Sequence, residues 1–172
     1  GGTPSLMEPE TLDAVLQAIR RNWAVSDVVE VTAEANPTSA EAAKFAAFAE
    51  AGVNRLSLGV QALDSGALKY LGREHSLDEA LEALKMGREK FCRVSFDLIY
   101  ARPGQSLKAW ENELGSAIAM GGDHLSLYQL TLEPGTAFYA AWQRGDLVPL
   151  DDDEAADFFD LTQCVCEEAG LP

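Results

Sequence analysis

The sequence has 172 residues, of which 13 are basic and 28 acidic, for a formal net charge of −15, and 47% are hydrophobic. This length and composition suit one domain with a real core. The acidity repels phosphate groups, so we expect neither nucleic acid nor an anionic membrane as a partner. No apolar run approaches the ~20 residues of a membrane-spanning helix, and no signal-peptide pattern is present, so a cytoplasmic location is the expectation.

Helical and strand patterns alternate along the chain. In chain order they predict a helix over residues 9–23, a strand over 28–34, a helix over 39–51, a strand over 55–61, helices over 64–71 and 77–90, a strand over 94–100, a helix over 106–120, a strand over 124–130, a short helix over 135–144 and a last helix that begins at 151–154 and ends at Gly170. Ser39 is the expected cap of the 39–51 helix, and Gly52 is its expected stop. The alternation predicts an α/β fold with about four parallel strands and outer helices.

The three cysteines, Cys92, Cys164 and Cys166, do not form a recognisable site. An odd number argues against a closed disulfide framework, and residues two apart on a helix do not face each other. We expect all three to be small hydrophobic residues, buried or half-buried. The phosphate-binding patterns G-x-G-x-x-G and G-x-x-x-x-G-K-[ST] are also absent, so neither a dinucleotide nor a P-loop site is indicated.

Every predicted strand alternates apolar with polar or small residues, so one face of the sheet is polar. Its members include Glu30, Thr32, Glu34, Ser57, Gly59, Gln61, Ser95, Asp97, His124, Ser126 and Tyr128. An unpaired buried carboxylate costs roughly several kcal/mol, so Glu34 and Asp97 must face solvent, a cation or a polar ligand. We predict an open sheet with a polar concave face, and sites at the carboxyl ends of its strands. A flavodoxin-like sheet with a few polar edge residues is the plainer alternative.

Six motifs follow one another in the sequence: G-G-T-P-S at 1–5, E-A-N-P at 34–37, A-G-V-N-R-L-S-L-G-V-Q at 51–61, L-G-R-E-H at 71–75, S-F-D-L-I-Y-A-R-P-G-Q at 95–105 and H-L-S-L-Y-Q-L-T-L-E-P-G-T at 124–136. Together they resemble the radical-SAM proteins of the oxygen-independent coproporphyrinogen III oxidase-like family, HemN and HemW. The last motif is most similar to the HemW branch of heme chaperones. The resemblance covers nearly the whole chain and implies a partial (β/α) half-barrel, with residues 1–172 as the central part of the radical-SAM core domain.

The resemblance also implies an S-adenosylmethionine site. Gly1, Gly2 and Thr3 match the glycine-rich turn at the amino end of this ligand, where backbone groups must come close to it. Glu34 matches the acid that binds its positively charged methionine or sulfonium part. Arg73 matches the clamp on its carboxylate, a task suited to a guanidinium fork.

Three further residues match the rest of the ligand. Gln61, at the end of its strand, would form a hydrogen bond with the ligand. Asp97 would bind the ribose hydroxyls, as acids at strand ends do in other nucleotide sites. Thr131 matches a position that offers its backbone to the adenine. His75 receives no catalytic role, because a single histidine beside a helix is more often structural, and His124 faces the predicted cavity without an assigned task.

The family's [4Fe–4S] cluster is bound by a C-x-x-x-C-x-x-C loop, which this sequence lacks. In the family the reduced cluster cleaves S-adenosylmethionine to a 5′-deoxyadenosyl radical. The resemblance places that loop before Gly1, so we expect the cluster only in a longer parent protein, no catalytic or metal-binding residue here, and an inactive chain. Gly1–Pro4 and Gly170–Pro172 both look like segments cut from longer elements. The sheet edges left open would favour self-association.

Two functions follow from the resemblance, and both have a tetrapyrrole as the small-molecule partner. The favoured one is a HemW-type heme chaperone, with heme as a further ligand. The alternative is a true coproporphyrinogen III dehydrogenase, which converts propionates to vinyls by oxidative decarboxylation. A third interpretation, an unspecific α/β domain with a degenerate site, fits poorly with the joint presence of Glu34, Gln61, Arg73 and Asp97.

Overall fold

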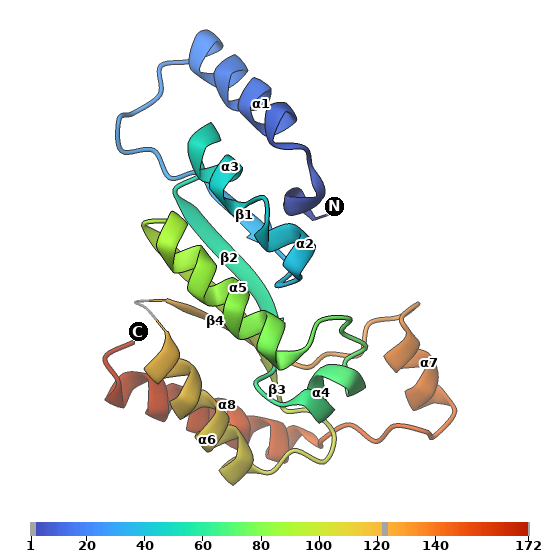
Figure 1. Ribbon diagram of the computed structural model, residues 1–172. Coiled ribbons are helices and arrows are strands. Elements are labelled where there is room, and N and C mark those ends of the chain that lie inside the picture. Colours follow the sequence, from blue (N-terminus) through green and yellow to red (C-terminus); the bar gives the residue numbers. More distant parts are fainter. Residues whose placement is uncertain (1–2, 122–123, 172) are drawn as a thin grey trace. The chain divides into compact units, whose positions relative to one another are not determined.

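Four strands form one sheet in the order β1-β2-β3-β4. The structure is a computed structural model that describes residues 3–121 and 124–171 (Figure 1). The strands are β1 (Thr32–Ala35), β2 (Arg55–Gln61), β3 (Arg93–Tyr100) and β4 (Leu125–Gln129). β1 runs parallel to β2. The predicted α/β fold with four strands and outer helices is therefore confirmed. The chain divides into two compact parts, Gly1–Asp97 and Leu98–Pro172, which are described in turn.

The first part buries the apolar face of β2 beneath helices. Its helical segments are η1 (Pro4–Leu6), α1 (Pro9–Asn22), α2 (Ser39–Ala42), α3 (Phe45–Ala51), α4 (Ser65–Tyr70) and α5 (Leu77–Lys90). Leu56 and Leu58 are completely buried, and α5 lies alongside β2 (Figure 1). A Cβ on Gly87 of α5 would come within 2.9 Å of Leu56 Cδ2. The glycine therefore sets how closely this helix approaches the sheet.

The segment predicted as one helix over 39–51 is two helices, and its cap is not Ser39. Thr38 has extended backbone angles, and its hydroxyl accepts a hydrogen bond from the Glu41 N–H at 3.3 Å, which makes Thr38 the cap of α2. α2 ends at Ala42, and α3 then begins at Phe45. The predicted stop is confirmed, because Gly52 follows α3 in the left-handed conformation with φ of 115°.

The strand predicted over 28–34 begins later, at Thr32. Val28 is 89% exposed, and the Val29 N–H donates to the Ser26 carbonyl at 3.2 Å in a turn. The Asn54 side chain holds the segment that follows, since it accepts from the Val31 N–H and donates to the Val29 carbonyl, both at 2.8 Å. The Val31 carbonyl also accepts from the Asn54 and Arg55 N–H groups at 3.0 and 3.2 Å, so side-chain and backbone groups of the segment before β2 together hold residues 29–31.

The second part is organised around a buried tryptophan. It contains α6 (Leu107–Met120), α7 (Ala137–Gln143) and α8 (Asp152–Glu168). Trp110 of α6 is completely buried, and its Nε1 donates to Thr162 Oγ1 of α8 at 2.8 Å. Thr162 in turn donates to the Phe158 carbonyl at 2.6 Å. Tyr100 at the end of β3 stacks on Trp110, with ring centroids 5.2 Å apart. Indole, hydroxyl and phenol ring together join α6, α8 and β3.

Two helices begin with a full capping box, as their sequences favour. α5 begins after Ser76, whose hydroxyl accepts from the Glu79 N–H while the Glu79 carboxylate accepts from the Ser76 N–H. α8 begins in the same way after Asp151, with Glu154 as the reciprocal partner. In both helices the third residue turns its carboxylate back to the cap.

The expected burial of the cysteines is wrong for two of them. Cys92 and Cys164 are exposed, and only Cys166 is partly buried. The buried side of α8 is formed by Phe158 and Thr162, and Cys166 follows Thr162 at the next position on that side, whereas Cys164 does not. Among the helices that the structure describes, none is long and apolar enough to cross a membrane.

We predict that Thr162→Val destabilises the second part. The valine has a similar shape but leaves the buried Trp110 N–H without its acceptor, which should lower the free energy of unfolding by ~1–3 kcal/mol. Chemical denaturation followed by tryptophan fluorescence measures this. Thr162→Ser, which keeps the hydroxyl, is the matched control and should lose less. Equal stability of the valine variant and the natural chain would contradict the assigned hydrogen bond.

The open edges of the described sheet give a second prediction. β1 and β4 are its outer strands, and unpaired edges invite pairing with another chain. We expect the 172-residue chain of 18.5 kDa to self-associate, with a mass by light scattering that rises with concentration. Tyr128→Lys, which places a charge on β4, should reduce this rise. A constant monomer mass over the concentration series would refute the prediction.

Candidate functional site

A row of polar side chains crosses β1, β2 and β3 in the first part. Glu34 of β1 lies opposite Ser57 of β2 in the parallel register, and Ser57 Oγ donates to Asp97 Oδ1 of β3 at 3.3 Å. Glu34 is exposed and Asp97 is half-buried. Leu56 and Leu58, which flank Ser57 in the chain, point to the helix-covered side. The two predicted carboxylates therefore flank one serine on the polar face.

A chain of hydrogen bonds leads to Asp97 along this face. Arg55 Nη2 donates to Ser95 Oγ at 3.3 Å, and Ser95 Oγ donates to Ser57 Oγ at 3.1 Å. Since Ser57 then donates to Asp97, one Asp97 oxygen is held in a defined orientation. Glu30 holds Arg55, where this series of hydrogen bonds begins, through an ion pair at 3.5 Å, and it also pairs with Arg93 at 2.5 Å.

The sequence analysis identified Ser57 and Ser95 only as members of the polar face and did not predict these hydrogen bonds. The signal that could have assigned them is strand parity, since Ser57, Ser95 and Asp97 all fall on the face opposite the apolar residues. The pairing itself depends on the register between β2 and β3, which the pattern of either strand alone does not contain.

Gln61 ends β2 in an unusual conformation. Its φ is 76°, a left-handed value that costs a residue with a side chain ~1–3 kcal/mol and is found most often at functional sites. The side chain is 91% buried and folds back over Gly59, where a Cβ would come within 2.8 Å of Gln61 Nε2. The absence of a side chain at Gly59 thus leaves room for the Gln61 amide in this position.

Arg73 lies in the turn between α4 and α5 and is exposed. Two residues later, His75 is buried, and its Nε2 lies 3.0 Å from the Val60 carbonyl. This contact ties the turn to the residue just before Gln61, so His75 has the structural role expected of it. Arg73 is therefore anchored beside the end of β2 by a neighbour in its own motif.

The first turn of α5, which follows Arg73 and His75, contains a carboxyl group with a shifted pKa. The Ser76 N–H and hydroxyl both donate to the Glu79 carboxylate, and these hydrogen bonds lower the pKa of Glu79. Glu79 and Arg73 line one shallow hollow together with Ser65, Leu68, Lys69, Glu74, His75 and Ser76.

The remaining predicted residues lie as follows. Thr3 begins η1, where its carbonyl accepts from the Leu6 N–H at 3.1 Å, and η1 contacts β1. Gly1 and Gly2 lie outside the described residues. Thr131 belongs to the second part and is exposed. It follows Leu130, whose N–H donates to the Tyr100 carbonyl at 2.9 Å.

The A-R-P-G-Q segment after β3 has a structural role in the second part. Arg102 is buried and pairs with Glu113 of α6 at 2.5 Å, and it also donates to the Ile99 carbonyl at 3.0 Å. Gln105 Nε2 donates to the same Glu113 carboxylate at 3.2 Å. The preceding residue, Ala101, has a φ of 56°. The sequence had singled out this segment without indicating the buried ion pair that shapes it.

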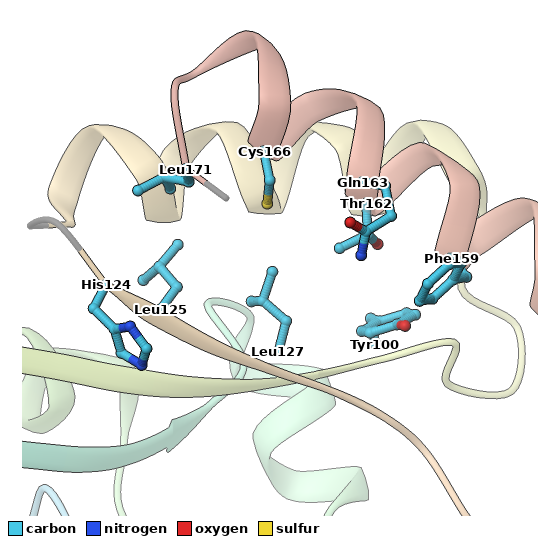
Figure 2. A pocket seen from close by; sticks show the side chains of 9 residues that line it. All are labelled: Tyr100, His124, Leu125, Leu127, Phe159, Thr162, Gln163, Cys166 and Leu171. Carbon is cyan, nitrogen blue, oxygen red and sulfur yellow. The ribbon is translucent and has the colours of Figure 1, made fainter.

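A cavity of about 220 Å³ lies between β4 and α8. Figure 2 shows Leu125 and Leu127 pointing towards α8, while the His124 ring lies on the other side of β4. Burial raises the pKa of the Cys166 thiol and of the Tyr100 phenol at this cavity. Within residues 3–121 and 124–171, no group of three His, Cys, Asp or Glu side chains could hold a metal ion.

The polar face of the first part offers two carboxylates and one amide, with a guanidinium anchored nearby. Carboxylates accept hydrogen bonds from hydroxyls and pair with cations, whereas a guanidinium binds a carboxylate. This set of groups suits a ligand that carries positive charge, negative charge and hydroxyls together.

Comparison with known proteins identifies the superfamily. The sequence profile described as "Radical SAM superfamily" matches residues 1–115. The mouse protein named "Radical S-adenosyl methionine domain-containing protein 1, mitochondrial" is 47% identical over 172 residues, which are 99% of this chain and 39% of the relative. The Escherichia coli protein named "Heme chaperone HemW" is 39% identical over 171 residues, 99% of this chain and 44% of the relative.

A solved structure shares the fold. Coproporphyrinogen III oxidase (HemN) from Escherichia coli superposes with a TM-score of 0.81 at 24% identity, over 99% of this chain and 39% of that chain. The chain thus spans about two fifths of the length of the relatives that it matches. The predicted resemblance is confirmed by sequence and by fold, and the chain belongs to the radical SAM superfamily.

Proposed function

We propose that the polar face of β1, β2 and β3 binds S-adenosylmethionine in the radical-SAM core of a HemW-type heme chaperone. The observation that carries this proposal is the row in which Glu34 and Asp97 flank Ser57. With an iron–sulfur cluster, S-adenosylmethionine supplies one-electron radical chemistry in this superfamily. The residues of this chain would bind and orient the molecule.

The groups on the page fit the charges of S-adenosylmethionine. The exposed Glu34 carboxylate would pair with the amino or sulfonium group, and the Arg73 guanidinium with the carboxylate. Asp97, held by Ser57 at 3.3 Å, would accept hydrogen bonds from the ribose hydroxyls. The buried Gln61 amide would add a hydrogen bond at the end of β2.

The backbone contacts of the ligand complete the proposal. Gly1, Gly2 and Thr3 would approach the amino end, and the Thr131 backbone would approach the adenine. η1, which Thr3 begins, contacts β1, and this contact supports placing Thr3 and Glu34 at the same end of the ligand.

The cysteines do not fit an iron–sulfur cluster. The three of them stand at Cys92, Cys164 and Cys166, without the spacing of a cluster loop. We propose that residues 1–172 are the central part of the core domain, and that the first strands, the cluster loop and a C-terminal domain belong to a longer protein. Relatives more than twice as long as the matched region support this. The chain alone should not cleave S-adenosylmethionine reductively.

The proposed partner is heme. Relatives from Escherichia coli and Bacillus subtilis that are named heme chaperones match 99% of this chain at 39% and 35% identity. Coproporphyrinogen III oxidation is the second candidate. The HemN match supports it by fold. Its sequence identity is 24%, below the 39% and 35% of the two heme chaperones, and this difference favours the chaperone.

We propose the cytoplasm as the location. The animal relatives are named as mitochondrial proteins, which makes the mitochondrion the competing location. Microscopy of a fluorescent fusion of the full-length protein decides between the two.

We predict that Asp97→Asn weakens binding of S-adenosylmethionine by about tenfold, ~1.4 kcal/mol, because a neutral amide is a poorer acceptor for the ribose hydroxyls. Ser57→Ala, which frees the Asp97 carboxylate to rotate, should have a smaller effect in the same direction. Calorimetric titration of the full-length protein, anaerobically reconstituted with iron and sulfide, measures both. Asp146→Asn, an exposed carboxylate paired with Arg144 in the second part, is the control. Unchanged binding by the Asp97 variant would remove this residue from the site.

The choice between the two partners gives a further prediction. We expect the full-length protein, anaerobically reconstituted with iron and sulfide, to bind heme and to leave coproporphyrinogen III unchanged when reductant and S-adenosylmethionine are added. Heme binding is followed by absorbance in the Soret region and the tetrapyrrole products by mass spectrometry. Formation of protoporphyrinogen would establish the oxidase function instead.

A further inference from the structure

One buried carboxylate outside all six motifs binds two of them. Glu41 of α2 is 94% buried. Its Oε2 accepts hydrogen bonds from Ser5 Oγ and, at 2.9 Å, from the Asn36 N–H. Its Oε1 accepts from Asn36 Nδ2 at 3.2 Å and from Thr38 Oγ1 at 3.5 Å. Both oxygens are therefore engaged by groups from segments before α2.

The local sequence predicts a different direction for this side chain. Thr38 and Glu41 have the spacing of a capping box, in which the third residue of the helix bonds the N–H of the cap. Glu79 of α5 and Glu154 of α8 do so. At α2 only the first half of the box forms, from the Glu41 N–H to Thr38. The Glu41 carboxylate turns instead to Ser5 and Asn36.

The partners of Glu41 lie next to residues of the proposed site. Ser5 belongs to G-G-T-P-S, two residues after Thr3, and it is completely buried. Asn36 belongs to E-A-N-P, two residues after Glu34. A single carboxylate thus holds the 3-10 turn η1, which follows Thr3, and the turn after β1, the strand that contains Glu34. A buried carboxylate keeps its charge at low cost only when donors surround it, so the donors and Glu41 hold one another in place.

We propose that Glu41 is a positioning residue that sets the spacing between the turn after Thr3 and the turn after the Glu34 strand, and thereby the affinity for the amino-acid end of S-adenosylmethionine. This inference rests on the proposed function. Glu41 acts on Thr3 and Glu34 through Ser5 and Asn36 and does not touch the ligand. Asp97, at the ribose, is held by a separate chain of hydrogen bonds through Ser57.

Because Glu41 and Ser57 hold different parts of the proposed site, a change at Glu41 should weaken the binding of one part of the ligand and leave the other part bound as before. Glu41→Gln replaces one acceptor oxygen by an amide donor, which then faces the hydroxyl or N–H donors of Ser5 and Asn36. The two turns should shift relative to each other, while the Asp97 side of the site stays in place. S-adenosylmethionine should lose affinity, whereas 5′-methylthioadenosine, which lacks the amino-acid part and the sulfonium charge, should not.

The experiment measures the dissociation constants of both ligands by calorimetric titration of the full-length protein, anaerobically reconstituted with iron and sulfide, and of its variants. We expect Glu41→Gln to raise the constant for S-adenosylmethionine about tenfold, and that for 5′-methylthioadenosine by less than about twofold. Glu154→Gln, at the same position of the α8 capping box, is the matched control and should change neither. Circular dichroism checks that each variant is folded.

Ser5→Ala is the second variant, which removes one partner of Glu41 and leaves α2 intact. It should show the same selective loss even where Glu41→Gln fails to fold. An equal loss for both ligands, or no loss in either variant, overturns the positioning role while the proposed site stands. If the unsubstituted full-length protein binds neither ligand, the proposed function fails, and the role of Glu41 fails with it.

Discussion

The direction of successive side chains along β2 is the constraint on which the rest of the structure depends. Leu56, Leu58 and Val60 are buried under the helices of the first part, so the residues that alternate with them must lie on the opposite face. Ser57 and Gly59 occupy that face, one to hold a carboxylate and the other to admit the Gln61 amide. A shift of the β2 register by one residue would turn the leucines to the polar face and Ser57 to the core. The burial of the leucines therefore fixes both the core and the face on which the site lies.

Support for the proposed site comes mainly from residues that would not touch the ligand. Ser57 orients Asp97, His75 anchors the turn of Arg73, and Glu41 joins η1, after Thr3, to the end of the Glu34 strand. Each of these contacts links segments that are distant in the sequence. A site built from several strand ends and turns needs such links, because a displacement of a side chain by less than ~1 Å already weakens its hydrogen bonds to a charged ligand.

The second part is stabilised by different interactions. Trp110 and Thr162 join its two long helices through a buried hydrogen bond, and the ion pair of Arg102 with Glu113 shapes the segment after β3. Both pairs are buried, so removal of one partner would leave an unsatisfied polar group. The A-R-P-G-Q motif thus contributes a buried ion pair and hydrogen bonds to the fold of the second part.

The sequence by itself determined what depends on neighbours along the chain: the bounds of β2 and α5, the stop at Gly52, and the polar face with Glu34 and Asp97. Periodicity and capping encode these features locally. Only the tertiary structure decided that β1 begins at Thr32, with the Asn54 side chain bonded to Val29 and Val31, and that the Glu41 carboxylate binds Ser5 and Asn36. The reason is physical: a side chain with several possible partners takes the ones that burial brings to it, and those come from segments whose proximity no local pattern records.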